Sequence, residues 1–440
     1  MRPSTGMLTD HYELTMLDAA LADGTAWLPA TFELFARGLP RGRGFGVVAG
    51  TARALDALQD FAFDSAALDF LATNRIVSAP ALDYLASYRF GGSVRGIPEG
   101  GLYFPFTPLL QVDGTFAECL VLETVLLSIY NFDSAVASAA ARMVLAAGGR
   151  SIVEMGSRRT HELAAVASAR AAYLVGAMAT SNLEAGRAWG IPTTGTVAHA
   201  FILAHVAEAD AFRAQLAAQG PDTTYLVDTY EIEQGIRTAV EIVGPGIGSI
   251  RIDSGDPRVE SKRARALLDE LGAHKTRIVY SGDLDEYRIA ALADSPIDAF
   301  GVGTRLVTGS GHPTCNFVYK LVAAGGRGVA KLSADKETLA NAKNPRRGYT
   351  SEGKLALEVL GLHDTEPDLP ASLKVAELLP AQELLVKEGE RLSYTSLNES
   401  RAFHRSQIEA LPEELLSLDT QGRALPTLLA SESGDLSPLG

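Results

Sequence analysis

The sequence predicts an α/β fold built around parallel strands. From about residue 150, an apolar run ending in glycine or polar residues is followed by an amphipathic helical pattern, and this unit recurs about seven times with short loops. The alternation is typical of an α/β barrel or of a doubly wound sheet, and the residues leave both open. In either fold, ligands bind at the carboxyl ends of the strands. The 440 residues suffice for two domains or for one barrel with additions.

The composition is that of a globular protein from a reducing compartment. Hydrophobic residues make up 47% and charged residues 21%, and the net charge of −14 argues against nucleic-acid or anionic-membrane partners, which require a basic face. The two cysteines, Cys119 and Cys315, show no zinc-site spacing, which favours a cytoplasmic location without disulfides. The N-terminus shows no signal-peptide pattern, and no apolar run reaches the roughly 18 residues of a membrane span.

The first expected element is a helix over residues 9–24. Thr9 is the expected N-cap, Tyr12, Met16 and Ala20 share one apolar face, and Gly24 ends the pattern. The other elements expected outside the repeated region are a strand at 31–35, helices over 51–90, a small, mostly antiparallel sheet over 91–116, helices at 118–130 and 133–147, short strands over 353–400, and a partly loose tail from 411.

The repeated region places polar residues and glycines at the ends of its strands. Some of them are helix caps: Asp256 precedes Pro257, and Asp283 with Glu286 resembles a capping box. The expected strand ends are IVEMG (152–156), VGAMATSN (175–182), IPTTGTVAHA (191–200), YLVDTY (225–230), SIRIDSGD (249–256), RIVYSGDLDE (277–286) and AFGVGT (299–304).

Together, these strand ends predict an anion-binding pocket. Arg158 follows one strand, and Arg251 and Asp253 lie two residues apart on one face of another. Arginine forks bind carboxylate and phosphate bidentately. The loops at 281–283 and 301–304 lead into helices, whose N-termini suit a terminal phosphate. The residues therefore indicate a protein that binds or converts a phosphorylated small molecule with a second anionic group.

His199 closes the stretch IPTTGTVAHA. A single histidine in a loop is most often structural, donating to a backbone carbonyl. Its place among anion-binding strand ends makes it a candidate general base or phosphoryl acceptor, and spacing does not separate these roles.

A set of distinctive motifs runs collinearly over roughly residues 8–335. They are TDHYELTM (9–16), GSRRTH (156–161), TSN (180–182), GTVAH (195–199), IRIDSGD (250–256), YSGDLDE (280–286), GVGTRLVT (301–308), YKLV (319–322) and KLS (331–333). As a set they resemble nicotinate phosphoribosyltransferase. The resemblance implies an irregular open α/β barrel over 126–320 and a sandwich-like α+β domain formed by both chain ends, 1–125 and 321–440.

The resemblance also implies the reaction. Phosphoribosyl pyrophosphate (PRPP) and nicotinate would give nicotinate mononucleotide and pyrophosphate in NAD salvage, driven by ATP hydrolysis through a phosphorylated histidine, which makes the enzyme ligase-like. ATP would be a co-substrate and Mg²⁺ would arrive with PRPP, without a tightly bound organic cofactor. The family forms homodimers with active sites between subunits, so the same assembly is expected here.

Individual roles follow from the motif positions. His199 resembles the phosphoryl acceptor, and Asp253 lies where an acidic residue approaches the ribose hydroxyls or magnesium. The residues that resemble nicotinate contacts are Tyr12, stacking from the partner subunit with Asp10 beside it, Met155, Arg158, Ser181, Thr196 and Arg251. Those that resemble PRPP or phosphate contacts are Arg159, Gly282, Asp283, Gly303 and Thr304.

Two positions depart from the family pattern. Met155 stands where relatives commonly place a ring-stacking Phe, although a thioether also packs on aromatic faces. Residues 344–347 read Asn-Pro-Arg-Arg where relatives tend to have Pro-Gly before a basic residue, which leaves phosphate roles of Lys336 and Arg346 open.

Ser181 favours nicotinate as the substrate. The nicotinamide-using relative has an aspartate at this position, which would repel a carboxylate. The alternatives are an ATP-independent nicotinamide or quinolinate phosphoribosyltransferase, a non-catalytic phosphosugar-binding scaffold of the same fold, and an unrelated aldolase-like barrel. A quinolinate site should need a denser Arg/Lys cluster, because quinolinate has two carboxylates. A non-catalytic scaffold need not keep His199 and Arg251, and both are present. An aldolase should show a lysine or a metal cluster at a strand end.

Overall fold

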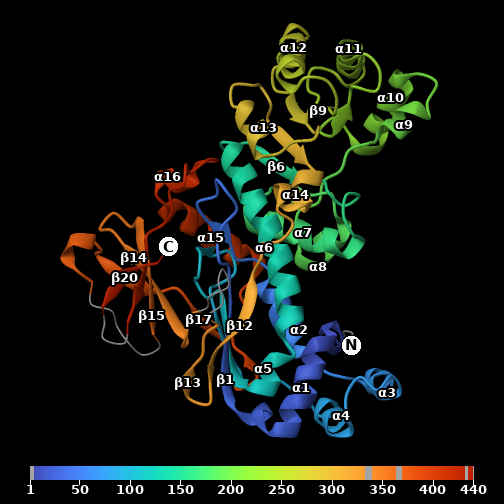
Figure 1. Cartoon of the computed structure of the whole chain (residues 1–440). Helices are drawn as coiled ribbons and strands as arrows, with labels where there is room; N and C mark the ends of the chain where they lie inside the picture. The colour runs from blue at the N-terminus through green and yellow to red at the C-terminus, as the bar shows by residue number, and fades with distance from the viewer. Residues whose placement is uncertain (1–3, 332–338, 363–368, 432–434, 440) are drawn as a thin grey trace. The chain divides into compact units, whose positions relative to one another are not determined.

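The computed structural model describes residues 4–331, 339–362, 369–431 and 435–439, which form two compact units (Figure 1). Unit 1 combines both chain ends, Met1–Ala135 and Thr314–Gly440, and unit 2 is the middle segment, Val136–Pro313. Helix α6 (Glu123–Ala146) runs from the first unit into the second. Both boundaries lie within the 126–320 segment expected for the barrel.

Unit 2 is built on a six-stranded parallel sheet with the order β7-β6-β11-β10-β9-β8 (Figure 1). The strands are short and apolar, and Ile250 and Ile252 of the fifth strand in this order are fully buried, as is typical of parallel sheets covered by helices. Strands β7 and β8 form the two edges, so the curled sheet is an open half-barrel. The predicted α/β fold with an open barrel is confirmed. The strands are β6 (Ser151–Glu154), β7 (Ala179–Thr180), β8 (Thr224–Leu226), β9 (Ser249–Ile252), β10 (Arg277–Tyr280) and β11 (Ala299–Val302).

Helices connect the strands of unit 2. They are α7 (Glu162–Leu174), α8 (Leu183–Trp189), α9 (His199–Leu203), α10 (Glu208–Gln219), α11 (Ile232–Val243), α12 (Pro257–Glu270), α13 (Glu286–Ala291), α14 (Thr304–Val307) and the 3₁₀ turn η3 (Gly309–Gly311). Asp256 caps α12 as expected, because its carboxylate accepts from two backbone N–H groups of the first turn. The expected capping box at Asp283 and Glu286 is wrong. Asp285 caps α13, and Asp283 has a φ of 33° in the loop before it.

Unit 1 is an α+β unit in which both chain ends share one sheet, as expected. Its seven strands have the order β13-β12-β1-β5-β3-β17-β18, and β1 pairs antiparallel with β12 and β5. A five-stranded sheet has the order β16-β14-β15-β19-β20, and β2 pairs with β4. The strands are β1 (Pro29–Phe35), β2 (Gly46–Val47), β3 (Ser93–Gly96), β4 (Leu102–Tyr103), β5 (Leu110–Thr115), β12 (Val318–Ala324), β13 (Arg327–Gly328), β14 (Lys343–Tyr349), β15 (Leu355–Leu362), β16 (Glu377–Pro380), β17 (Glu383–Lys387), β18 (Glu390–Arg391), β19 (Thr427–Ala430) and β20 (Leu436–Pro438).

One prediction about the helices is wrong. The helices expected at 118–130 and 133–147 are mostly one helix, α6, because tertiary contacts satisfy the polar residues at the expected break. In the tail from 411, β19 pairs with β15 in parallel. The helices of this unit are η1 (Gly6–Leu8), α1 (His11–Asp23), η2 (Thr25–Trp27), α2 (Thr51–Gln59), α3 (Ser65–Thr73), α4 (Ala79–Ala86), α5 (Phe116–Leu120), η4 (Ala371–Leu373), α15 (Leu397–Ala410) and α16 (Glu413–Leu416).

Helix α1 buries a different face from the one expected. Its N-cap is Asp10, whereas Thr9 donates its hydroxyl to Glu13 in the first turn. Glu13 is fully buried and also accepts from the backbone N–H of Thr124. This buried carboxylate turns Tyr12 outward, where its side chain is 45% exposed. Gly24 ends the helix in the left-handed region, with a φ of 86°, as expected.

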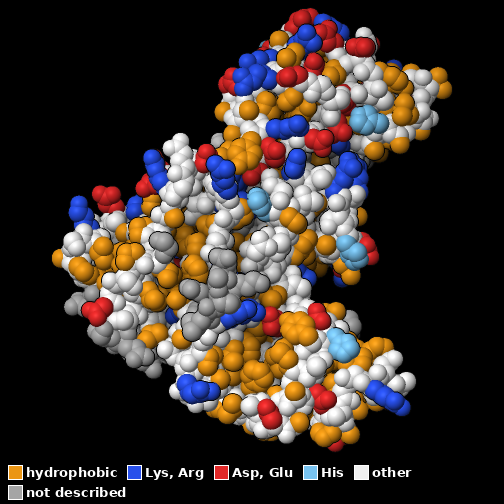
Figure 2. All heavy atoms as spheres, in the orientation of Figure 1, with side chains coloured by type: hydrophobic (Ala, Val, Ile, Leu, Met, Phe, Trp, Pro, Cys, Tyr) orange, Lys and Arg blue, Asp and Glu red, His pale blue; other side chains and the backbone are white. Residues whose placement is uncertain are grey.

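Within the described residues, the stretch Phe116–Ala146 contains an 18-residue window that is long and apolar enough to cross a membrane by length and composition alone. Because 67% of that window is buried, it fits the core helix of a globular protein. On the surface of unit 2, acidic and basic side chains are interspersed over α12 (Figure 2), where Arg263 and Arg265 pair with Glu260 and Asp269.

Candidate active site

A pocket of about 220 Å³ lies at the carboxyl ends of the parallel strands in unit 2. It gathers most of the residues expected to contact nicotinate or PRPP, together with Ser281 and Gly301, which belong to the two expected phosphate loops but were given no individual contact. Its three arginines outnumber its two aspartates, so the pocket carries a net positive charge and favours anions. The lining residues are Met155, Arg158, Arg159, Arg251, Asp253, Ser281, Gly282, Asp283, Gly301, Gly303 and Thr304.

Arg251 is the centre of the hydrogen-bond network on one wall. It lies on β9, and its guanidinium donates from Nε to Ser281 Oγ at 2.7 Å and from Nη1 to Thr196 Oγ1 at 2.8 Å. Nη2 lies 3.0 Å from Asp253 Oδ1, which also accepts from Ser281 Oγ at 2.6 Å. The fork is thus held on three sides, as the recognition of a planar carboxylate requires.

His199 lies at the start of α9 and pairs with Asp228. Its Nε2 is 3.1 Å from Asp228 Oδ1, and the Asp228 side chain is fully buried while that of His199 is 41% exposed. The other oxygen of Asp228 accepts from the Asp253 N–H at 2.8 Å and from Ser254 Oγ at 2.7 Å. The sequence placed Asp228 at a strand end, in YLVDTY, but gave no function for it. The fold shows that Asp228 lies within hydrogen-bond distance of His199 and can orient its ring.

The stretch 191–200 extends from one edge of the open sheet toward the other. Thr193 forms a parallel bridge with Thr180 of the edge strand β7, instead of the expected strand end. Three residues later, Thr196 contacts Arg251 on β9, and His199 contacts Asp228 just after the opposite edge strand, β8. This short segment therefore brings a candidate substrate contact and a candidate phosphoryl acceptor to the same rim.

A buried carboxylate, Glu154, supports the loop that follows β6. It accepts from Thr180 Oγ1 at 2.5 Å and from the Gly156 N–H. Burial raises the pKa of Glu154, and these two hydrogen bonds oppose the increase. A Cβ on Gly156 would lie 2.2 Å from Val307 Cγ1, so only glycine lets this loop pack on α14. Glu154 was not predicted; its one signal was a charge within the apolar run IVEMG.

Comparison with known proteins identifies the family. Residues 7–131 match the nicotinate phosphoribosyltransferase N-terminal domain, and residues 150–352 match the nicotinate phosphoribosyltransferase family. Nicotinate phosphoribosyltransferase pncB1 of Mycobacterium tuberculosis is 50% identical over 430 residues, which cover 96% of this chain and 94% of that protein.

The chain belongs to the nicotinate phosphoribosyltransferase family.

Further relatives agree with this assignment. A nicotinate phosphoribosyltransferase of Bacillus subtilis is 36% identical and covers 83% of this chain and 76% of its own length. The crystal structure of human nicotinic acid phosphoribosyltransferase superposes with a TM-score of 0.84 at 27% identity, covering 97% of this chain and 98% of that chain. Family membership assigns the chain an enzyme activity in NAD salvage.

In this family member, the two glycine-containing loops of the pocket lead into very short helices. Gly282 and Asp283 precede α13, which has six residues. Gly303 and Thr304 lie at the start of α14, which has four residues. Because the helix dipole depends on aligned peptides, such short helices add little positive potential here, and the positive charge of the pocket comes mainly from its arginines. Among the residues that the structure describes, no three His, Cys, Asp or Glu side chains cluster as a metal site.

Some of the expected contacts lie outside the pocket. Ser181 follows β7 and donates its N–H to the Glu154 carbonyl at 2.9 Å, without lining the pocket. Tyr12 and Arg346 belong to unit 1. Burial and the nearby carboxylates Glu123 and Glu13 raise the pKa of Tyr12 to about 12, so the phenol is neutral at physiological pH. Lys336 lies outside the described residues.

Glu208, at the start of α10, is a partly buried carboxylate whose ionised form is destabilised by its surroundings. Burial and the Asp228 charge raise its pKa from 4.5 to about 6. A raised carboxyl pKa means that ionisation weakens the fold, a penalty that develops between pH 4.5 and 6 and is complete above it. We therefore expect Glu208→Gln to raise the Tm at pH 8 more than at pH 4. The same substitution at exposed Glu241 of α11 is the matched control; a pH-independent effect at Glu208 would contradict the prediction.

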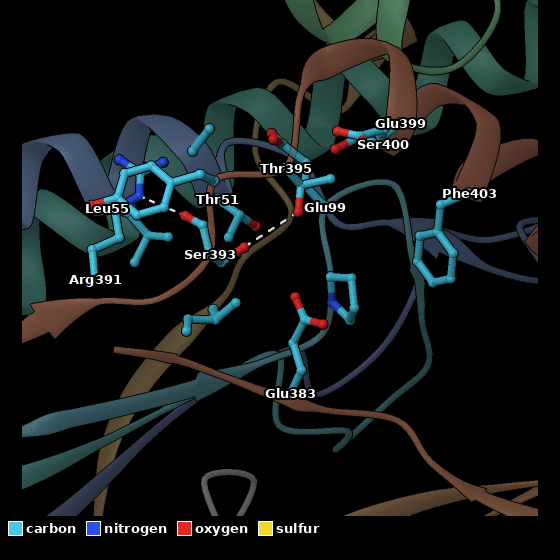
Figure 3. Close-up of a pocket in the computed structure, with 14 residues that line it drawn as sticks. Thr51, Leu55, Glu99, Glu383, Arg391, Ser393, Thr395, Glu399, Ser400 and Phe403 are labelled. Carbon is cyan, nitrogen blue, oxygen red and sulfur yellow. Dashed lines mark hydrogen bonds between the residues drawn. The ribbon is translucent and has the colours of Figure 1, made fainter. Parts of the chain in front are cut away.

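Unit 1 contains a larger cavity, of about 530 Å³, that does not fit the family's substrates (Figure 3). Glu99, Glu383 and Glu399 line it, and carboxylates repel anionic ligands. Three of its charged groups already have partners: Glu99 accepts from a backbone N–H, Glu399 belongs to the capping box of α15, and Arg391 pairs with Asp56 at 2.7 Å. The smaller strand-end pocket is therefore the candidate active site.

Proposed function

We propose that this chain transfers the phosphoribosyl group of PRPP to nicotinate, with ATP hydrolysis coupled through a phosphorylated His199. The observation that carries the proposal is the single rim on which Thr196 contacts Arg251 while His199, three residues later, pairs with Asp228. The Arg251 fork and the Thr196 hydroxyl suit the nicotinate carboxylate. The positive pocket beside them suits the phosphates of PRPP, with Arg158 and Arg159 toward the pyrophosphate.

The pairing of His199 with Asp228 supports a phosphoryl acceptor. When Nε2–H donates to Asp228, the lone pair of Nδ1 becomes the nucleophile. Nδ1 attacks the γ-phosphorus of ATP, the bond to the β,γ-bridging oxygen breaks, and ADP leaves. The phosphorylated ring adds negative charge and acceptor oxygens at the pocket rim, which can order nearby N–H groups and arginines.

The transfer itself needs positioning and charge stabilisation from the protein. Departure of pyrophosphate from the ribose gives an oxocarbenium-like transition state, which the nicotinate nitrogen attacks. Mg²⁺ would neutralise the charge of the pyrophosphate, and Asp253 is the pocket carboxylate that would face the metal or the ribose hydroxyls. Because Asp253 Oδ1 already accepts two hydrogen bonds, the metal would be held mainly by PRPP.

The proposed assembly is a homodimer in the cytoplasm with active sites between subunits. Tyr12 supports it, since this large side chain is 45% exposed at the start of α1 and its neutral phenol could stack on a pyridine ring. Met155 would pack on the ring from within the pocket, where it lies against Gly301: a Cβ on that glycine would be 2.7 Å from Met155 Sδ.

The decisive test detects phosphate on His199. Mass spectrometry of the protein incubated with ATP and Mg²⁺ should find a phosphorylated His199 peptide that is lost on adding nicotinate and PRPP. In parallel, turnover of nicotinate should exceed that of nicotinamide and rise with ATP. An unmodified histidine together with ATP-independent turnover would refute the coupling, and preferential turnover of nicotinamide would refute the substrate.

Ser181→Asp should lower nicotinate turnover. A second carboxylate near the bound nicotinate would repel it, and a repulsion of about 2 kcal/mol corresponds to a roughly 30-fold loss in kcat/KM. Ser181→Asn is the matched control, because it has the same shape as aspartate without the charge and should retain most activity. Steady-state kinetics with nicotinate would measure both variants, and unchanged kinetics in Ser181→Asp would contradict a site near the carboxylate.

A further inference from the structure

A buried network outside the pocket joins three segments of unit 2. Arg142, near the end of α6, places Nε 3.2 Å from Glu286 Oε1 and donates from Nη2 to the Tyr287 hydroxyl at 3.2 Å. The second oxygen of Glu286 accepts from Ser310 Oγ at 2.5 Å. The Arg142 and Glu286 side chains are only 6% and 2% exposed, so water competes little for these contacts.

Glu286 connects the two segments that form the glycine-containing side of the pocket. It directly follows the loop 281–285, and Ser310 lies at the end of the segment that begins at Gly303. Ser310 has a φ of 53°, a conformation that side-chain-bearing residues rarely adopt. The Glu286 carboxylate holds this residue by its hydroxyl, and it fixes the end of one segment to the end of the other.

We propose that Arg142, Glu286 and Ser310 are positioning residues that hold the segments 281–285 and 303–310 at the separation required by the 5-phosphate of PRPP. This inference rests on the proposed PRPP reaction. None of the three side chains lines the pocket, so they act through the two segments. A buried ion pair adds little net stability, whereas it restricts geometry, and a misplacement of about 1 Å at a reacting group can lower the rate roughly 100-fold.

The test separates PRPP binding from nicotinate binding. Ser310→Gly removes the hydroxyl, while glycine adopts a φ of 53° without strain, so the variant should fold. Glu286→Gln keeps the shape and removes the charge. We expect both variants to raise the KM for PRPP, by about tenfold for Glu286→Gln, with the KM for nicotinate within about twofold of wild type. An unchanged KM for PRPP in Ser310→Gly and Glu286→Gln would overturn the proposal.

A matched ion pair in unit 1 controls for general loss of stability. Arg347 Nε lies 3.2 Å from Glu358 Oε1, and the two side chains are 4% and 0% exposed. Glu358→Gln should lower the Tm without changing the KM for PRPP. An equal rise in that KM would overturn the positioning role. If the wild-type enzyme shows no PRPP-dependent turnover, the proposed function fails. If the wild-type enzyme turns over PRPP but the KM for PRPP is unchanged in Ser310→Gly and Glu286→Gln, only the positioning role fails.

Discussion

Replacing His199 by alanine should remove the stimulation of turnover by ATP while a slow reaction without ATP remains. The imidazole is the proposed acceptor of the γ-phosphoryl group, and loss of a positioned nucleophile or base lowers rates by roughly 100-fold or more. The guanidinium of Arg251 makes no hydrogen bond to the imidazole, since its partners are Thr196, Ser281 and Asp253. Initial rates with saturating nicotinate and PRPP, with and without ATP, measure the expected change.

His205 provides the matched control, because it lies just after α9 and bonds the Phe201 carbonyl at 2.8 Å rather than a carboxylate. His205→Ala should keep the ATP stimulation. Asp228→Asn keeps the shape of the side chain but removes the charge that stabilises the imidazolium, and so should give less phosphohistidine at equal ATP. Full ATP coupling in His199→Ala would contradict the phosphohistidine route.

The alternating pattern was enough to predict the parallel sheet and the edge of the sheet at which the candidate pocket lies. This worked because each strand can be recognised from a short continuous run of residues, such as IRID or IVEM, and because parallel strands end on the same side of a sheet. The neighbours Arg251 and Asp253 were placed on one face by their spacing alone, and the structure brings them to 3.0 Å. Naming their substrates required the resemblance, since spacing predicted only an anion site.

Contacts between distant segments were not predictable from the sequence. His199 and Asp228 are 29 residues apart, and they meet only because the stretch 191–200 extends from one edge strand of the open sheet toward the other. Glu154 was missed for a similar reason: a charge at the end of a buried strand is acceptable only when Thr180, from the adjacent strand, donates to it.

The expected break in α6 shows how tertiary contacts override local preference. Asn131 and Asp133, at the expected break between 130 and 133, are polar residues of low helix propensity. In the folded protein, Asn131 Oδ1 accepts from the Phe317 N–H at 2.9 Å and from a threonine hydroxyl, and Asp133 pairs with Arg53 at 2.5 Å. These partners come from segments up to 186 residues away, so the helix continues.

Arg251→Lys should reduce kcat/KM for nicotinate by roughly 100-fold, because a lysine ammonium cannot reproduce a guanidinium fork that is held by three partners. Ser281, Thr196 and Asp253 each bond a different nitrogen of Arg251, so one amine would lose at least two of these contacts. Kinetics with each substrate varied in turn should show a larger rise in the KM for nicotinate than for PRPP. Arg263→Lys on α12, where the arginine is 64% exposed, should leave both unchanged.

The same variant tests substrate choice independently of overall activity. If Arg251 binds the carboxylate of nicotinate, losing the fork weakens nicotinate more than nicotinamide, whose amide gains little from a bidentate cation. The ratio of the two kcat/KM values should therefore fall in Arg251→Lys, even if both reactions slow. A constant ratio would mean that Arg251 orders the pocket through Thr196 and Asp253 without contacting the carboxylate, and the acid preference would then have to come from another group in the pocket.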